Sequence, residues 1–201
     1  MNRRAVFLDK DGTLIENVPY NVDPALIRLA PGVVEGLRAL HGSGYQLVVI
    51  TNQSGVARGY FPEAALAAVK RRLRELLDAH GVPLAGFYYC PHHPDGVVPG
   101  YDCACACRKP APGLLRVAAR KQGLDLAQSW FVGDILNDVE AGRRAGCRTI
   151  LIDSGGETEW DLTPPRRPHH IVPDFRRVAP IIMRGEKGEG RREKLEMRRE
   201  K

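Results

Sequence analysis

The stretch FLDKDGTLIEN, residues 7–17, places two aspartates directly after a short apolar run. In an extended backbone, residues i and i+2 share a face, so Asp9 and Asp11 can point at one spot. Two carboxylates at one spot repel each other, and a bound cation relieves that repulsion. Gly12 permits a sharp exit of the chain. Taken alone, the motif leaves open a simple turn at Asp11 and Gly12, with Asp9 as a cap.

On both sides of this motif, short β-branched apolar runs alternate with segments of helical spacing. The runs that predict buried strands are 5–9, 45–51, 86–90, 129–134, 148–153 and a last short one at 169–172. The segments that predict helices are 32–44, 62–81, 112–123, 137–146 and about 174–184. Alternation of this kind predicts parallel βαβ units, so we expect one α/β domain with a doubly wound parallel sheet.

Polar residues follow the predicted strands at the edge where such sheets bind ligands. Those at or just after a strand end are Asp9, Asp11, Thr51, Asn52, Cys90 and Asp134. The hydroxyl of Thr51 and the amide of Asn52 suit phosphate oxygens, although a plain turn explains them too. Lys109 can neutralise developing charge or lie in solvent, and Pro110 after it suits a helix start. Asp138, one helical turn after Asp134, can also simply complement the helix dipole.

Together these motifs resemble the haloacid dehalogenase superfamily of phosphohydrolases: DxDGT, a strand ending in TN, a lysine, then GDxxxD. The resemblance spans about residues 5–153. It implies that Asp9 is the nucleophile that forms an aspartyl-phosphate and that Asp11 is the general acid and base. It also implies Mg²⁺ on the Asp9 carboxylate, the Asp11 carbonyl and Asp134. Thr51 and Lys109 would hold the phosphoryl group, with Asp138 positioning the lysine.

Members of this superfamily commonly select substrates with an inserted cap domain, and this sequence leaves no room for a full one. One loop and one helix fill the interval from Gly12 to Val49. The interval from Asn52 to Lys109 holds a helix, a strand and a cysteine-rich loop. A cap of some 60 or more residues fits neither interval. We therefore expect an open site whose specificity resides in short loops.

The cysteine-rich segment, CPHHPDGVVPGYDCACACRKP at 90–110, has the pattern of a metal site. Cys90 and His92 are followed after twelve residues by Cys105 and Cys107. Three thiolates and one imidazole complete a tetrahedral zinc set with no position for water, so we expect structural Zn²⁺ in the loop 90–107. Cys103 can replace Cys105 or stay free, and a redox-active thiol pair is the other reading.

Within this scaffold, CPHHP with CxCRKP, and TNQSGVARGYF, look like the D-glycero-D-manno-heptose-1,7-bisphosphate 7-phosphatase family. The resemblance implies Mg²⁺-dependent removal of the 7-phosphate from a small phosphorylated sugar, as a step of carbohydrate metabolism. The zinc loop would be a specificity element. Arg108 would contact the second phosphate or the sugar, and Arg58 is another candidate for that task. Ile135 departs from the family pattern, which has a basic residue directly after the aspartate of the fourth motif.

Three other functions remain open at this point. A histidinol-phosphate phosphatase shares the catalytic residues and a similar zinc loop, but Arg108 favours a second anion site. A polynucleotide 3′-phosphatase is suggested by TNQ and the basic charge, although no G-x-x-x-x-G-K-[ST] kinase motif accompanies it. A zinc-dependent nucleic-acid-binding protein would use the basic tail and would leave the aspartates unexplained.

Composition is typical of a globular protein that acts in the cytoplasm. The chain has 201 residues, 43% hydrophobic and 27% charged, and lacks the run of roughly 20 apolar residues that spans a bilayer. No signal peptide is indicated, so clustered cysteines favour a metal over disulfides. Of the net charge of +6, the segment 184–201 contributes +3 from eight basic and five acidic residues. We expect a phosphatase domain over 1–184, a disordered tail over 185–201, a monomer, and neither membrane nor nucleic-acid binding.

Overall fold

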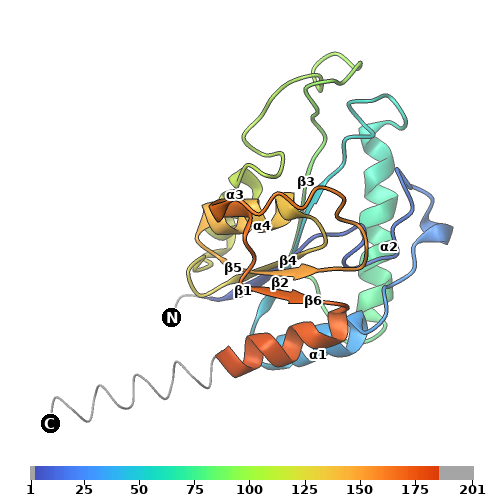
Figure 1. Ribbon diagram of the computed structural model, residues 1–201. Helices are drawn as coiled ribbons and strands as arrows, with labels where there is room; N and C mark the ends of the chain where they lie inside the picture. The colour runs from blue at the N-terminus through green and yellow to red at the C-terminus, as the bar shows by residue number, and fades with distance from the viewer. Residues whose placement is uncertain (1–2, 186–201) are drawn as a thin grey trace, which may run out of the picture.

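The computed structural model describes residues 3–185, which form a six-stranded parallel sheet with helices on both faces (Figure 1). The strands are β1 (Ala5–Leu8), β2 (Gln46–Asn52), β3 (Gly86–Cys90), β4 (Trp130–Gly133), β5 (Arg148–Ile152) and β6 (His170–Val172). The helices between them are α1 (Val33–Gly42), α2 (Leu66–Asp78), α3 (Gly113–Gln122) and α4 (Leu136–Ala145). The doubly wound parallel sheet expected from the sequence is confirmed, with strand ends within one residue.

The alternation of side chains along β1 divides the core into two layers. Val6 and Leu8 face a cluster that includes α1, α2 and the C-terminal helical residues 178–185. Ala5 and Phe7 face the opposite cluster, built on α3 and α4. All four side chains are fully buried. Helices therefore cover both faces, which is why the strands are apolar on both sides rather than alternating with polar residues.

The strand order is β3-β2-β1-β4-β5-β6, and the point at which this order reverses lies between β1 and β4. The chain builds β2 and β3 on one side of β1 and β4, β5 and β6 on the other. The adjoining crossovers therefore lie on opposite faces and leave a crevice beyond the carboxyl ends of these strands. The backbone N–H of Asp9 donates to the carbonyl of Val132 at 2.9 Å, which extends the β1–β4 pairing up to the first aspartate.

The connections above the carboxyl edge are loops, and no inserted cap domain interrupts the described chain. A short 3-10 turn, η1 (Pro24–Leu26), and α1 separate β1 from β2. The loop after β2 leads through η2 (Glu63–Ala65) into α2, and the loop after β3 stands above the sheet beside it (Figure 1). α3 begins at Gly113, so Pro110 precedes the helix instead of opening it as expected.

The C-terminal part of the described chain packs back on α1. The single helix expected over 174–184 is divided into the 3-10 turn η4 (Phe175–Arg177) and the helical residues 178–185. The side chain of Asp174 accepts the N–H of Arg176 and caps this turn. Apart from residue 185, the expected tail over 185–201 lies outside the described residues. Among residues 3–185, no helix has the length and apolar character that a bilayer span requires.

Candidate active site

A buried lysine connects Asp9, directly after β1, with Asp138 of α4 at the carboxyl edge of the sheet. Lys109 Nζ is paired with Asp9 Oδ1, lies 2.6 Å from Asp138 Oδ1 and donates to the Ile50 carbonyl at 3.2 Å. Lys109 is only 3% exposed and Asp138 only 1%. Burial alone would lower the pKa of Lys109, but the carboxylates of Asp138 and Asp9 raise it, so the ammonium stays charged. The site thus holds a fixed positive charge beside Asp9.

Asp134, directly after β4, supplies a third carboxylate to the same place. Ligand oxygens of Asp9, Asp134 and Asp138 lie within 4.8 Å of one another. Burial, and then the charges of Asp9 and Asp138, raise the pKa of Asp134 to about 8. Three carboxylates facing one ammonium leave an excess of negative charge, which a divalent cation offsets. Asp138 uses Oδ1 for Lys109 and Oδ2 for the Ile135 N–H, so the residues that fit Mg²⁺ are Asp9 and Asp134.

Gly12 is required beside this cation site. Its φ is +78°, and a β-carbon there would collide with the carboxylate of Asp134. The hydroxyl of Thr13 donates to Asp134 Oδ1 at 3.1 Å. The turn after β1 therefore approaches Asp134 closely enough to orient its carboxylate. A simple turn at Asp11 and Gly12 would not require this contact with Asp134.

Asp11 is held on both of its oxygens. The amide of Gln53 donates to Oδ2 at 3.1 Å, and the buried Lys10 ammonium lies 3.1 Å from Oδ1. Gln53 also donates to the Thr51 hydroxyl at 3.0 Å. Burial raises the pKa of Asp11, and the charge of Lys10 opposes that rise. A carboxyl with a raised pKa is suited to carry a proton to a leaving group.

Asn52, which the sequence suggested as a phosphate donor, lines the site and also holds the backbone of Lys109. Its amide donates to the Lys109 carbonyl at 3.2 Å and accepts from the Lys109 N–H at 3.0 Å. This pair of hydrogen bonds fixes the lysine backbone against the end of β2. Thr51 is 1% exposed, and its hydroxyl lies at the floor of the site.

These side chains surround an open cavity of about 210 Å³, lined by Asp9, Asp11, Asn17, Thr51, Asn52, Lys109, Asp134, Ile135 and Gly156. A second hollow of about 120 Å³, shared at Asp11, Asn17 and Asn52, continues toward Tyr20 and Phe61. The expected arrangement of Asp9, Asp11, Thr51, Lys109 and Asp134 around one space is therefore present. The size suits a phosphate and part of a small polar molecule.

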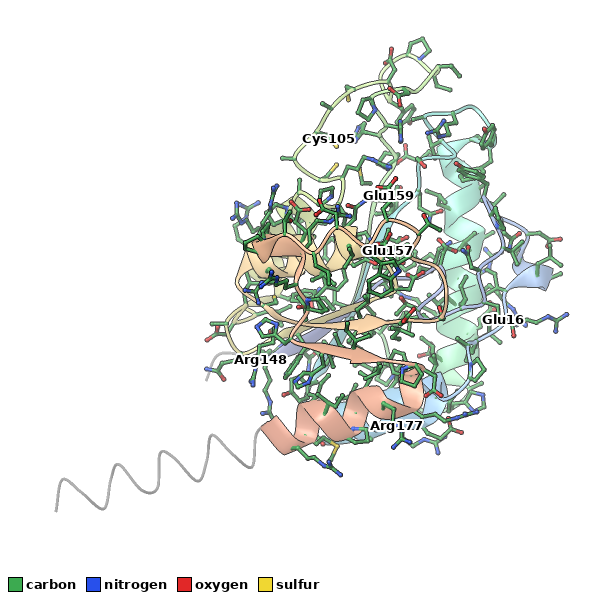
Figure 2. All side chains as sticks on the ribbon, viewed as in Figure 1. Glu16, Cys105, Arg148, Glu157, Glu159 and Arg177 are labelled. Atoms are coloured by element: carbon green, nitrogen blue, oxygen red, sulfur yellow. The ribbon has the colours of Figure 1, made fainter. Side chains whose placement is uncertain are left out.

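Ile135, the departure in the fourth motif, lines this cavity and precedes α4 without a capping side chain oxygen. Glu157, on the segment after β5, accepts the N–H of Leu136 at 2.5 Å. A residue 21 positions further along the sequence therefore caps α4 (Figure 2 labels Glu157). Glu157 also accepts the N–H of Glu159 at 2.7 Å. The segment after β5 is thereby fixed beside Asp134.

The four expected zinc ligands lie close together, with Cys90 at the end of β3 and the other three in the loop after it. Figure 2 labels Cys105 of this group. The Cys107 thiol lies 3.0 Å from Cys90, 3.1 Å from Cys105 and 3.4 Å from His92 Nδ1. Burial, and then the hydrogen bond with Cys107, raise the pKa of the Cys90 thiol, so a cation is needed to make it a thiolate. Three sulfurs and one nitrogen around one point fit Zn²⁺. Cys103 is exposed and is not part of this group.

Arg58 and Arg108 each contact a histidine of the loop after β3. Arg58 Nη2 lies 3.1 Å from His93 Nε2, and Arg108 Nη1 lies 3.5 Å from the carbonyl of His92. Burial, and the charge of Arg58, lower the pKa of Arg108. Burial, and then the charge of Arg108, lower the pKa of His93. Two guanidiniums held near each other form a site that favours an anion.

Sequence reasoning missed Lys10, Thr13, Gln53 and Glu157. Lys10 and Thr13 lie inside the first motif, and their burial could have been suspected from the apolar residues around them. Gln53 follows Thr51 by two positions, which places both on one face of an extended segment and is a signal that was available. Glu157 lies in a segment without any periodic pattern, so no sequence signal identified it.

Comparisons with known proteins agree with this geometry. The HAD-hydrolase-like family model matches residues 106–178. A D-glycero-beta-D-manno-heptose-1,7-bisphosphate 7-phosphatase of Haemophilus ducreyi is 41% identical over 170 residues, which are 81% of this chain and 93% of that protein. A D-glycero-alpha-D-manno-heptose-1,7-bisphosphate 7-phosphatase of Photorhabdus laumondii is 36% identical over 77% of this chain and 85% of its own.

A solved structure gives the same fold. The D,D-heptose 1,7-bisphosphate phosphatase of B. bronchiseptica, complexed with magnesium and phosphate, superimposes with a TM-score of 0.75 at 31% identity. The match covers 90% of this chain and 99% of that one. The buried aspartate and lysine cluster, the cysteine and histidine loop and this degree of identity show that the chain belongs to the D-glycero-D-manno-heptose-1,7-bisphosphate 7-phosphatase family of HAD-like hydrolases.

Proposed function

We propose that this protein hydrolyses the 7-phosphate ester of a D-glycero-D-manno-heptose 1,7-bisphosphate through an aspartyl-phosphate. The observation that supports it most directly is the pairing of Lys109 with Asp9 and Asp138 at the floor of the 210 Å³ cavity. A carboxylate fixed beside a buried cation is arranged to receive a phosphoryl group whose negative charge the same cation stabilises. Sequence similarity to enzymes named for this substrate supports the assignment of the sugar.

In the first step, a carboxylate oxygen of Asp9 attacks phosphorus and the bond to the sugar oxygen breaks. Asp11 donates its proton to that oxygen, so the sugar leaves as an alcohol. In the second step, Asp11 accepts a proton from water, whose oxygen attacks the same phosphorus and releases inorganic phosphate. Asp9 is thereby regenerated as a carboxylate.

The remaining residues hold the phosphoryl group and the catalytic groups in place. Lys109 and the Thr51 hydroxyl would face the phosphoryl oxygens, while Asn52 and Asp138 fix Lys109. Asp9, Asp134 and the Asp11 carbonyl would hold Mg²⁺, which when bound supplies positive charge between the carboxylates and the phosphate. Gln53 and Lys10 would keep Asp11 directed into the cavity.

Specificity for a bisphosphate is proposed for the loop that carries the zinc ligands. Cys90, His92, Cys105 and Cys107 would hold Zn²⁺ as a structural ion, since all four positions are protein ligands. The end of that loop presents Arg108, and the loop after β2 presents Arg58. A guanidinium pair at the rim would bind the second phosphate while the first one is cleaved.

A phosphate-release panel tests this function. The substrates are the alpha and beta anomers of D-glycero-D-manno-heptose 1,7-bisphosphate, histidinol phosphate and a 3′-phosphorylated oligonucleotide. We expect the highest kcat/KM with one heptose anomer, and relatives named for each anomer make that comparison informative. A higher kcat/KM with histidinol phosphate or with the oligonucleotide contradicts the proposal.

We further propose that the protein acts in the cytoplasm as a monomer with a domain over 1–184. All five cysteines are unpaired and four of them are gathered where a metal fits, which is typical of proteins in a reducing compartment. Cell fractionation tests the cytoplasmic location, and the molar mass in solution tests the monomer.

A further inference from the structure

One carboxylate accepts hydrogen bonds from two tyrosines of different segments. Tyr89 Oη donates to Glu63 Oε1 at 2.9 Å, and Tyr101 Oη donates to Glu63 Oε2 at 2.7 Å. Glu63 is the first residue of η2, Tyr89 lies in β3 and Tyr101 lies in the zinc-ligand loop. A single side chain therefore connects η2 with β3 and with the loop that follows β3.

Both hydrogen bonds are of the strong, charge-assisted kind, with one phenol on each carboxylate oxygen. Burial raises the pKa of Tyr89, and the hydrogen bond to Glu63 raises the pKa of Tyr101. Both phenols therefore remain protonated donors at neutral pH. None of the residues that the proposed mechanism uses is among these three.

The two loops that Glu63 connects are also packed together. Val56, Phe61 and Leu66 form a small buried cluster against which the rings of Tyr89 and Tyr101 lie. The carbonyl of Ala57 accepts the N–H groups of Val97 and Val98, at 2.7 and 3.0 Å. The loop over 53–61 and the loop over 91–107 thus form one unit above the sheet (Figure 1).

The two arginines that are proposed to bind the second phosphate belong to this unit or directly follow it. Arg58 belongs to the first loop, and Arg108 directly follows the second. His93 lies against Arg58, and its own N–H donates to the Tyr101 carbonyl at 3.0 Å, so the Tyr101 segment and the arginine are connected. The two guanidiniums repel each other, and their spacing therefore depends on how firmly the loops are joined.

We propose that Glu63 is a positioning residue for recognition of the second phosphate: by joining Tyr89 and Tyr101 it locks the two loops together and fixes the spacing of Arg58 and Arg108. This inference rests on the proposed function of those arginines. Glu63 itself lines neither the 210 Å³ cavity nor the hollow that continues from it. Its removal affects binding of the bisphosphate and spares the chemistry at Asp9.

The test compares Glu63→Ala with the wild-type full chain on two substrates. One is the heptose 1,7-bisphosphate, and the other is p-nitrophenyl phosphate, which has a single phosphate. We expect KM for the bisphosphate to rise about tenfold, as for the loss of hydrogen bonds to a charged group, with kcat within about twofold. We expect kcat/KM for p-nitrophenyl phosphate to stay within about twofold.

The chain offers matched controls for this experiment. Tyr88→Phe removes a hydroxyl from the next position of β3, where it accepts from Gln122 at 3.0 Å and does not contact Glu63, so KM should not change. Tyr89→Phe combined with Tyr101→Phe should reproduce the effect of Glu63→Ala. Glu63→Gln keeps the side-chain length and one acceptor oxygen, and should recover most of the binding.

Amide hydrogen exchange gives a readout that does not depend on turnover. In Glu63→Ala, the N–H groups of Val97 and Val98 should exchange faster, while those of β1 and β4 remain protected. An unchanged KM for the bisphosphate overturns the inference. Equal loss of kcat on both substrates, with faster exchange across the sheet, also overturns it, because Glu63 would then only stabilise the fold.

Failure of the proposed function gives a different result from failure of the role proposed for Glu63. If wild-type protein prefers p-nitrophenyl phosphate to the bisphosphate, the bisphosphate assignment fails, and with it the role of Glu63 in binding the second phosphate. Joining of the loops by Glu63 is then judged by exchange at Val97 and Val98: faster exchange supports it, and unchanged exchange overturns it.

Discussion

Asp138 places a carboxylate oxygen 2.6 Å from the ammonium of Lys109, and both side chains are almost completely buried. The aspartate comes from α4 and the lysine from the loop before α3, so the pair joins that loop to α4 beside the catalytic cavity. Burial raises the pKa of Asp138 to about 6, and the charge of Lys109 opposes that rise. Asp138 therefore directs this oxygen to the lysine that is also paired with Asp9.

Asp138→Asn should lower kcat by about 10- to 100-fold, because a charge-assisted hydrogen bond to a buried ammonium is lost while the volume is kept. Steady-state phosphate release measures this. Asp78→Asn, at an exposed aspartate that ends α2, is the matched control and should leave kcat unchanged. A loss of Mg²⁺ affinity with unchanged kcat would instead make Asp138 a metal ligand.

Asp9→Asn should reduce turnover by about 10⁴-fold or more, since an amide is a poor nucleophile toward phosphorus. The substitution keeps the size of the side chain, so the fold should persist. Acid quenching during turnover should trap phosphate on wild-type protein and none on the variant. Equal labelling of both proteins would move the nucleophile away from Asp9.

The sheet and the chemical centre could be predicted because each depends on a local pattern. Short apolar runs predicted the strands, Asp9 and Asp134 directly follow β1 and β4, and Thr51 is the last but one residue of β2. Parallel strands meet at one edge, so residues far apart in the chain could be expected to lie together before their distances were known.

The contacts that orient these groups could not be predicted, because they depend on which loops meet. Asn52 binds the backbone of Lys109, which is 57 positions away, and Glu157 caps α4 from 21 positions away. Glu63 meets Tyr101 across 38 positions. A single sequence contains no period or spacing that specifies such pairs, since they follow from tertiary packing alone.

Gln53→Met should impair proton transfer by Asp11 more than it impairs the other functions of the site. The thioether keeps the length of the side chain but cannot donate to Asp11, so the carboxyl loses one of its two supports. We expect kcat to fall about tenfold on the sugar phosphate, a part of the 10²- to 10⁴-fold effect of general acid catalysis. The effect should be smaller on p-nitrophenyl phosphate, whose leaving group needs no proton. Gln128→Met, at an exposed glutamine, is the control, and equal losses on both substrates would exclude this role of Gln53.

Loss of one zinc ligand should loosen the loop and leave the catalytic centre intact. Cys105→Ser removes a thiol that lies 3.1 Å from Cys107, whereas Cys103→Ser changes an exposed thiol of the same loop outside the ligand group. We expect bound zinc to disappear only from the first variant, by metal analysis. Its amide exchange should rise over 91–107, and KM for the bisphosphate should increase about tenfold through displacement of Arg108. A variant that keeps loop protection and binding but loses kcat would show that the zinc takes part in the chemistry.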